Sequence, residues 1–516
     1  MNPLQPEVVV IGASLGGVLA AWRAAQAGCK VLLVAEHPWI GGQFTSQAVP
    51  PDEHGLIEFG GASASYLAFR TDMRRLYQSL PGFLDRAGLT PGCNPGDGWV
   101  SRLCIEPQHA VRWFEALLSP QIHSGRLKLL RLTRLLAAQR EGSRVSEVLL
   151  RRQDGRVLRV QAPWFIDATD TGELLVQAEV PYRVGKEARA EFDEPDAPER
   201  ADTLDQQPVT QVMALRWMPQ ATAAIAAVTP PPGYDFWRSH RPPQFQHLLF
   251  SPGLPGRGAG VSASLPFSGE GRTLDWWRYR RIVSGAQWTP ARADVTLVNW
   301  AQNDYALHPL LDGPRPQAEV EAGARELSLC LLHWLQTEAP RPEGGFGYPE
   351  WQPACDVLGT PDGLAQQVYV RESRRIVGRD TLHQGELLKP PRQRADAVAI
   401  GWYNLDIHPT CVSGQGCNTP VQPFELALGH FIPAQGGNVI PACKNIAVTH
   451  LANACTRVHP VEWAVGEVAG LLAAQCHAQG WPDSAAQVLA LQARLQTVGV
   501  LRHWPDELLA RAQPSH

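Results

Sequence analysis

Short apolar runs alternate with polar or glycine-rich turns at the N-terminal end of the chain. Residues 7–11 read EVVVI, a β-branched run typical of a buried strand. The glycine-rich stretch GASLGG follows at 12–17, and the apolar sequence VLAAWRAAQAG at 18–28 is typical of a helix. A second apolar run, KVLLVA at 30–35, ends at Glu36. The pattern predicts a strand, a tight turn, a helix and a second strand parallel to the first.

The turn and the acidic residue after the second strand form the arrangement with which proteins hold a dinucleotide. Gly12 allows the sharp exit from the strand, and Gly17 lets the helix pack closely on it. Backbone N–H groups at the start of the helix are expected to face the phosphates. Glu36 can accept hydrogen bonds from both ribose hydroxyls, and its charge would repel a 2′-phosphate. Ser14 stands where a second glycine is usual, and its hydroxyl can donate to a phosphate.

Amphipathic or alanine-rich segments predict four further helices. One lies near 65–80, and a second at 107–119 has Pro107 in its first turn. Two alanine- and leucine-rich helices are expected near 462–480 and 485–513, packed back on the first domain.

Strand patterns return in the middle of the first half of the chain. Apolar alternation through 126–161 predicts two or three strands, separated by turns at Glu141-Gly142 and Asp154-Gly155. Another apolar strand begins at Trp164 and ends in small and polar residues at 168–172.

From about residue 185 to 425 the composition changes. Proline clusters appear, and tryptophans concentrate in this region. A chain of 516 residues is long enough for two or three domains. The change predicts a second domain of mixed sheet and helices.

Net charge, apolar runs and cysteine content limit the expected partners, compartment and metal content of the protein. The net charge of −4 gives no indication of a nucleic-acid surface. The sequence contains no run of eighteen apolar residues, so no membrane span is predicted. The start MNPLQPEVVV has no charged leader region. The ten cysteines are scattered without a CxxC pair, which indicates free thiols in a reducing cytoplasm. No cluster of His, Cys and carboxylate residues has metal-ligand spacing, so no metal is expected.

The choice between NAD and FAD depends on whether later segments of the chain are needed beside the first turn. No second dinucleotide turn is evident, because the glycines at 256–260 follow proline-rich sequence rather than a strand. A simple NAD dehydrogenase would not need returning segments at 164–172 and near the C-terminus. An elongated FAD would need them, because its adenine, pyrophosphate and flavin contact distant parts of a chain. FAD is therefore the expected cofactor.

Several segments in the same order resemble the glutathione-reductase-like FAD superfamily, and most closely its bacterial branch of FAD-dependent oxidoreductases. Besides the first turn and Glu36, they are IGGQFTSQAVPPDEH at 40–54, FIDATDTGELL at 165–175, WWRYRRIV at 276–283, NWAQNDY at 299–305, YVRESRRIVG at 369–378 and THLANACTRVHPVEWAVGEVAG at 449–470. The resemblance covers most of the chain, and its last motif is the most specific.

The resemblance implies an α/β fold. The implied fold has a Rossmann-like FAD-binding domain with a parallel sheet and a β-meander. A mixed α+β substrate domain is inserted into this FAD-binding domain. We expect a discontinuous FAD-binding domain at 1–49, 103–184 and 426–516, a loop and helix insertion near the flavin at 50–102, and a substrate (cap) domain at 185–425.

Cofactor contacts are expected from the first turn, the second strand end, the flavin-side loop and the start of the last motif's helix. Pro460 is placed to open that helix, so its first N–H groups would stabilise an anionic reduced flavin. The glycine pair at 41–42 would let the chain pass close to a bulky ligand. The residues assigned to the cofactor are Ile11, Gly12, Ser14, Leu15, Gly16, Gly17, Glu36, His37, Gly41, Gly42, Gln43, Ser46, Leu135, Ala168, Thr169, Asp170, Arg457, His459, Pro460, Val461 and Glu462.

Three residues are candidates for catalysis. His450 and His459 flank the expected flavin edge and can titrate near neutral pH. Direct contact with the flavin is the alternative role for His459, and a structural role for His450. Arg371 belongs to a charged cluster that either faces an anionic substrate or forms a salt-bridged junction.

The leading hypothesis is removal of a hydride from a small organic substrate to flavin N5, followed by reoxidation by oxygen, quinone or another carrier. A flavin monooxygenase is the nearest alternative. Others are an electron-relay subunit without a small-molecule substrate, and a degenerate fold that has lost its cofactor. The oligomeric state, the substrate and a covalent flavin link stay open.

Overall fold

The computed structural model describes residues 3–84, 93–219, 227–243, 245, 247–252 and 275–512. The glycines at 256–260, and residue 513 of the last predicted helix, lie outside these residues. The absence of a second dinucleotide turn at 256–260 therefore stays a prediction.

A five-stranded parallel sheet contains the two predicted N-terminal strands. Its order is β20 (Val439–Pro441), β7 (Trp164–Asp167), β1 (Val8–Ile11), β2 (Val31–Val34) and β3 (Leu127–Leu130). The first two apolar runs form β1 and β2, and every residue of both strands is buried. From β1 the chain continues to β2 on one side, while β7 pairs on the other, so a crevice is expected at the carboxyl ends of these strands.

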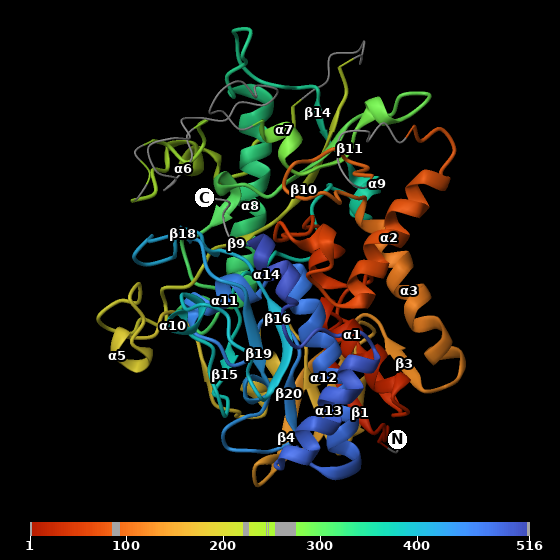
Figure 1. Cartoon of the computed structure of the whole chain (residues 1–516). Coiled ribbons are helices and arrows are strands. Elements are labelled where there is room, and N and C mark those ends of the chain that lie inside the picture. Colours follow the sequence, from red (N-terminus) through yellow and green to blue (C-terminus); the bar gives the residue numbers. More distant parts are fainter. Residues whose placement is uncertain are drawn as a thin grey trace.

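Two helices cross at very short range over this sheet (Figure 1). They are α1 (Leu15–Gln26), which follows the first turn, and α12 (His459–Gln479) near the C-terminus. A Cβ at Gly466 would lie 2.3 Å from the carbonyl oxygen of Gly16, and one at Gly470 would lie 2.3 Å from that of Ala20. The glycines of α12 are therefore required for the backbones of the two helices to touch.

The antiparallel meander consists of β4 (Thr133–Glu141), β5 (Arg144–Arg152) and β6 (Val157–Gln161). Its turns contain Gly142 and Gly155 at positive φ, as the hairpin prediction requires. The prediction of two or three strands through 126–161 was wrong in number, because β3 and β4 are separate strands in different sheets. Leu132, at φ +52°, turns the chain between them, and residue type alone does not predict that conformation.

The predicted helices are present with two changes of length. The first is α2 (Ala64–Ser79), and α3 (Pro107–His123) continues through Pro120 beyond its predicted end. The helix predicted at 485–513 is two helices, α13 (Ala485–Thr497) and α14 (Asp506–Ala512). Gly499, at φ +79°, lies between them.

The second group of elements is mixed sheet and helix. An antiparallel sheet has the order β11 (Arg281–Val283), β12 (Val295–Val298), β10 (Met213–Trp217) and β14 (Trp351–Pro353). The long helix α8 (Gln317–Thr337) shares a tryptophan-rich core with this sheet, at the end of the molecule opposite β20 and α13 (Figure 1). Together with the parallel sheet and the meander, this confirms the predicted α/β fold class.

The shorter elements are η1 (Gly42–Phe44), η2 (Ile57–Phe59), α4 (Glu173–Gln177), β8 (Tyr182–Arg183), α5 (Arg189–Phe192), β9 (Val209–Thr210), α6 (Tyr234–Ser239), α7 (Trp276–Tyr279), η3 (Gly285–Gln287), η4 (Ala301–Asn303), β13 (Asp304–Tyr305), α9 (Cys355–Leu358), β15 (Arg375–Ile376), α10 (Gln384–Leu387), β16 (Ala397–Gly401), β17 (Leu405–Ile407), β18 (Cys417–Thr419), β19 (Phe424–Ala427), η5 (Leu428–Phe431) and α11 (His450–Thr456).

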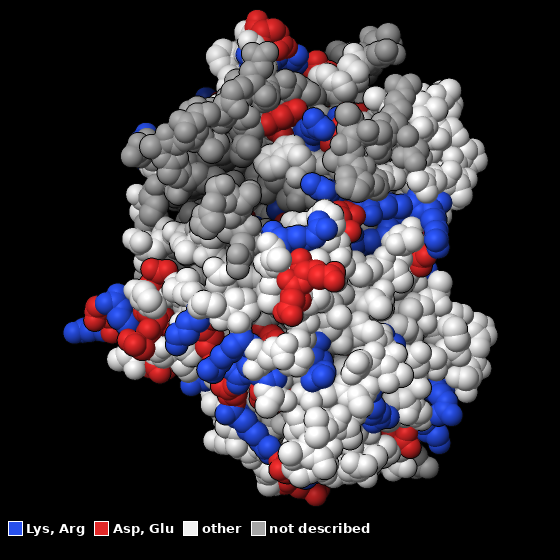
Figure 2. Space-filling model, in the orientation of Figure 1, with Lys and Arg blue, Asp and Glu red and all other residues white. Residues whose placement is uncertain are grey.

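The charged residues of both signs are interspersed on the face shown in Figure 2. Within the described ranges, no helix combines the length and the apolar character needed to cross a membrane.

Candidate functional site

A cavity of about 570 Å³ lies at the carboxyl ends of β1, β2 and β7. Its floor is the turn after β1, the end of β2 with Glu36 and His37, and the turn after β7. Its opposite wall comes from the first turns of α8 and from residues 366–370. The cavity therefore joins the predicted dinucleotide turn to the second group of elements, at the place where open α/β sheets bind ligands.

The first turn leaves no room for larger side chains. Gly12 has φ +95°, and a Cβ there would lie 2.4 Å from the carbonyl oxygen of Ala168. A Cβ at Gly17 would lie 2.2 Å from the carbonyl oxygen of Gly12. Glycine is thus required at both positions for the close approach of β1, α1 and the turn after β7.

Ser14 is the N-cap of α1. Its Oγ accepts a hydrogen bond from the backbone N–H of Gly17 at 3.2 Å, and the residue belongs to the cavity lining. A serine in place of the usual second glycine therefore supplies the acceptor that a helix start needs. The N–H of Gly16 donates to a carboxylate oxygen of Glu462 at 3.2 Å. Two first-turn amides expected to face phosphates thus donate within the protein.

The structure brings part of the predicted cofactor set together in this cavity. Its lining includes Gly12, Ser14, Glu36, His37, Ser46, Ala168, Thr169 and Asp170. The other predicted residues are not in its lining: Ile11, Leu15, Gly16, Gly17, Gly41, Gly42, Gln43, Leu135, Arg457, His459, Pro460, Val461 and Glu462.

Some of the residues outside the lining have protein neighbours that explain their positions. A Cβ at Gly41 would meet the Phe114 ring at 2.6 Å, and one at Gly42 would meet the backbone of Leu15 at 2.8 Å, so the glycine pair fits against protein. The Leu135 side chain packs in the core between the sheet and the meander, while Arg134 beside it lines the cavity.

Sequence reasoning missed the far wall and one buried amide. The wall residues Gln211, Gln317, Glu321, Arg325, Gln366 and Gln367 carried no motif, although they line the cavity. Gln47, in the loop after η1, is completely buried, and neither its amide oxygen nor its nitrogen has a partner among the described residues. The strand period around Leu135 was the one available signal for Arg134, because neighbouring strand residues point to opposite faces.

A buried cluster connects the turn after β7 to α12. Ligand atoms of Asp170, Cys443 and Glu462 lie within 4.8 Å of one another. The Lys444 ammonium lies among them, 2.5 Å from Asp170 and 3.5 Å from Glu462. Burial raises the pKa of the Cys443 thiol well above its usual value, so the thiol is protonated. Lysine thus supplies the cationic charge in this cluster.

His459 begins α12 and is fully buried. Burial and the charges of Lys444 and Arg280 hold its pKa well below the usual value, so the imidazole is neutral. Its Nδ1 accepts a hydrogen bond from the backbone N–H of Asp52 at 3.1 Å, which places the proton on Nε2. Nε2 makes no hydrogen bond of good geometry in the described part of the chain, although the backbone of Val49 lies close enough to the ring to raise its pKa slightly.

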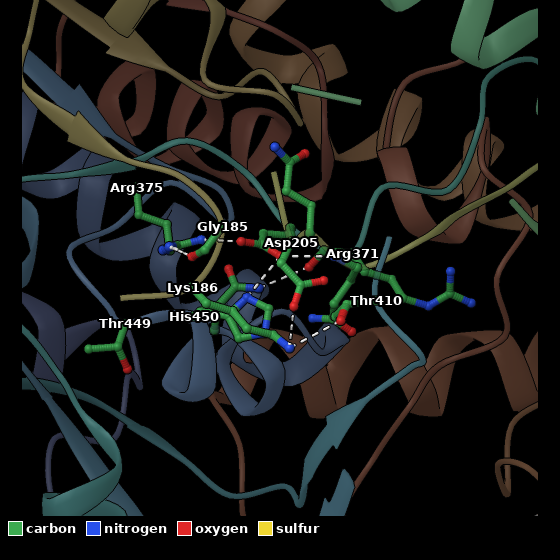
Figure 3. A network of polar contacts seen from close by, with 12 residues as sticks. Gly185, Lys186, Asp205, Arg371, Arg375, Thr410, Thr449 and His450 are labelled. Carbon is green, nitrogen blue, oxygen red and sulfur yellow. Dashed lines mark hydrogen bonds and ion pairs between the residues drawn. The ribbon is translucent and has the colours of Figure 1, made fainter. Parts of the chain in front are cut away.

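His450 does not line the cavity. It is buried at the start of α11, with Nδ1 3.0 Å from Glu372, and Figure 3 shows it in a polar network with Arg371 and Arg375. Burial would raise the pKa of Glu372, but His450 and Arg375 lower it to about 2. These contacts favour the structural role for His450.

Arg371 does not line the cavity either, and its guanidinium contacts other residues of the protein. Its guanidinium donates to the carbonyl oxygen of Pro208 and to Thr210, and lies 2.9 Å from Asp304. The neighbouring residues of the cluster are paired as well, Glu372 with Arg375 and Arg374 with Asp312. The salt-bridged junction is therefore the arrangement present here.

The comparison that decides the family covers nearly the whole chain. A family model described as FAD dependent oxidoreductase matches residues 7–495. The chain belongs to this family. Membership confirms FAD as the cofactor and makes the chain an FAD-dependent oxidoreductase. A search of curated proteins found none that matches.

Several solved structures are similar to part or most of this oxidoreductase at low sequence identity. The myxobacterial chondrochloren halogenase CndH is 16% identical over 42% of this chain and 44% of its own, with a TM-score of 0.22. OxyS anhydrotetracycline hydroxylase from Streptomyces rimosus is 11% identical over 96% of this chain and 67% of its own, with a TM-score of 0.33. A mutant of E. coli quinol fumarate reductase FrdA is 11% identical over 96% and 74%, with a TM-score of 0.34. The oxidoreductase thus spans less than half of the halogenase.

The residues present fit FAD. The turn that only glycine can form, and Glu36 at the end of β2, offer a place for the adenosine part. The unpartnered polar atoms of Gln47 and His459 lie in the flavin-side loop and at the start of α12. Buried polar groups of this kind are normally satisfied, and a bound cofactor would supply the partners that they lack.

Proposed function

We propose that this oxidoreductase removes a hydride from a small organic substrate and passes the electrons to oxygen, a quinone or another carrier. We place it in the glutathione-reductase-like superfamily. The described cysteines form no disulfide, which supports the reducing cytoplasm as the compartment that we propose. When bound, FAD supplies the hydride acceptor at flavin N5.

The observation that carries the proposal is the single cavity shared by the first turn and the second group of elements. An electron-relay subunit would need an exposed redox edge instead of walls from α8 and residues 366–370. Walls on both sides support a cofactor that is enclosed between the sheet and the second group of elements, as a reaction with an oriented small molecule requires.

The proposed role of each residue follows from its position beside the cofactor. Glu36 and His37 are placed for the adenosine ribose, and Ser46, Thr169 and Asp170 line the route away from it. The N-terminal end of α12 directs its positive dipole end at the proposed flavin position. His459, neutral with a proton on Nε2, would donate a hydrogen bond there instead of accepting a substrate proton.

A dye-linked assay tests this function. The purified protein, loaded with FAD, is mixed with an artificial electron acceptor and a panel of small hydroxy, amino and carboxylic acids. We expect dye reduction that depends on one substrate class and on FAD. Dye reduction only by a nicotinamide nucleotide, with oxygen-dependent hydroxylation of the panel compound, would instead establish a monooxygenase.

A further inference from the structure

Arg280 is a buried cation with unsatisfied donors. It follows α7 directly and is 7% exposed. Its Nε and Nη1 have no hydrogen-bond partner among the described residues. Burying charged donors without an acceptor is strongly unfavourable, so such groups normally face a ligand or a partner.

The neighbours of Arg280 do not satisfy it. Its Nη2 lies 3.4 Å from the Tyr279 hydroxyl and 3.7 Å from an Asp52 carboxylate oxygen, both long for charged hydrogen bonds. Burial lowers the pKa of the guanidinium, but Tyr279 and Asp52 raise it by more. The net pKa lies above its usual value, so the guanidinium stays charged. The second buried arginine nearby, Arg457, donates instead to Tyr369 and Asp406.

Arg280 is connected to the proposed flavin position through Asp52. The carboxylate of Asp52 faces Arg280, and the backbone N–H of Asp52 donates to Nδ1 of His459. The positive charge of Arg280 also helps to hold the pKa of His459 below its usual value. The free donors of Arg280 and the free Nε2 of His459 therefore belong to the same buried region.

We propose that Arg280 binds the carboxylate of an organic-acid substrate and so determines which substrates this enzyme accepts. The inference rests on the proposed function, because it names the substrate class of that reaction, and it places the substrate beside the proposed flavin position near His459 and not in the cavity that Glu36 lines. Asp52 and Asp406 already balance Arg280 and Arg457 in charge, so a singly charged carboxylate adds less unbalanced charge than a doubly charged phosphate would. A carboxylate oxygen supplies the acceptor that Nε and Nη1 lack.

Titration of the FAD-loaded enzyme with carboxylates tests the proposal. Acetate and benzoate are compared with acetamide and benzamide, and binding is measured by calorimetry and by the change in the flavin absorption spectrum. The acids are expected to bind, and the amides to bind at least tenfold more weakly. Arg280→Gln is expected to weaken acid binding by roughly ten- to a hundredfold, and Arg280→Lys by less.

Arg278→Gln is the matched control, because Arg278 is exposed and pairs with Asp97. It should bind acids as the wild type does. Equal binding of acids and amides, or unchanged acid binding in Arg280→Gln, would overturn the inference. If Arg280→Gln does not fold, its melting curve will show this, and Arg280→Lys is then compared with the wild type. Failure to bind FAD would overturn the proposed function instead, while calorimetry with benzoate still reports on Arg280.

Discussion

The carboxylate of Glu462 accepts a hydrogen bond from the backbone N–H of Gly16, 3.2 Å away, across 446 positions of sequence. The contact joins the first turn of α12 to the first turn of α1, beside the cavity. The same carboxylate lies 3.5 Å from the Lys444 ammonium. The start of the nucleotide turn is therefore held by residues from the C-terminal part of the chain.

Loss of this charge should destabilise the fold. Glu462→Gln keeps the size of the side chain but leaves Lys444 with Asp170 alone. We expect the free energy of unfolding to fall by about 2–4 kcal/mol, since one partner of a buried ion pair is removed. Urea unfolding followed by circular dichroism measures the change. Glu507→Gln, in the exposed first turn of α14, is the control and should stay within about 0.5 kcal/mol of the wild type.

The contact between α1 and α12 should not tolerate a methyl group. A Cβ at Gly466 would lie 2.3 Å from the carbonyl oxygen of Gly16, which is backbone and cannot move aside. Gly466→Ala is expected to lower the free energy of unfolding by about 3 kcal/mol and to weaken FAD binding. Gly55→Ala is the matched control, because a Cβ there meets nothing within 4 Å. Equal stability of the two variants would show that the helices are not in backbone contact.

Glu36 should determine affinity for the adenosine end of FAD. We expect Glu36→Gln to weaken FAD binding roughly tenfold and Glu36→Arg to weaken it more, since a charged acceptor at the ribose is lost. Fluorescence quenching of FAD measures both. Glu321→Gln provides a control on the opposite wall of the same cavity. If Glu36→Arg leaves the affinity unchanged, the ribose does not lie at Glu36.

Glu173 should make stability depend on pH. Burial, with the charges of Glu36 and Asp167, raises its pKa from 4.5 to about 7. The folded protein then holds a proton that the unfolded chain releases, so the free energy of unfolding falls as the pH rises from about 4.5 to about 7. Glu173→Gln cannot ionise, and above pH 7 it should be more stable than the wild type by about 1–2 kcal/mol.

Thermal melts of the two proteins between pH 4.5 and pH 8 measure this difference. It should vanish at the acid end and grow toward neutral pH. Glu179→Gln is the control, since the Glu179 side chain is 82% exposed. A pH-independent difference between Glu173→Gln and the wild type would mean that folding does not raise the pKa of Glu173.

Local patterns predicted the parts of the fold that local interactions determine. The apolar runs of β1 and β2, Gly12 and Glu36 could be assigned from sequence, because a turn, a buried strand and a strand end have their own residue preferences. The split of the segment 128–139 into β3 and β4 could not, since it depends on which sheet each half joins.

The site was predictable only where it follows a motif. His450 and Arg371 have residue types suited to catalysis, but their partners Glu372 and Asp304 determine their role, and a single sequence does not show such contacts. Gln47 and Arg280 are distinguished by buried polar atoms that have no hydrogen-bond partner among the described residues, which is a property of the folded structure alone.

Anaerobic mixing of the FAD-loaded enzyme with its organic-acid substrate tests the central claim most directly. The measured quantity is the absorbance of the oxidised flavin. Our account predicts that it bleaches in the absence of oxygen and of any nicotinamide nucleotide, in proportion to the substrate added up to one equivalent, and more slowly when the reacting C–H bond carries deuterium. A flavin that stays oxidised with every acid tested, and bleaches only with a nicotinamide nucleotide, would contradict it.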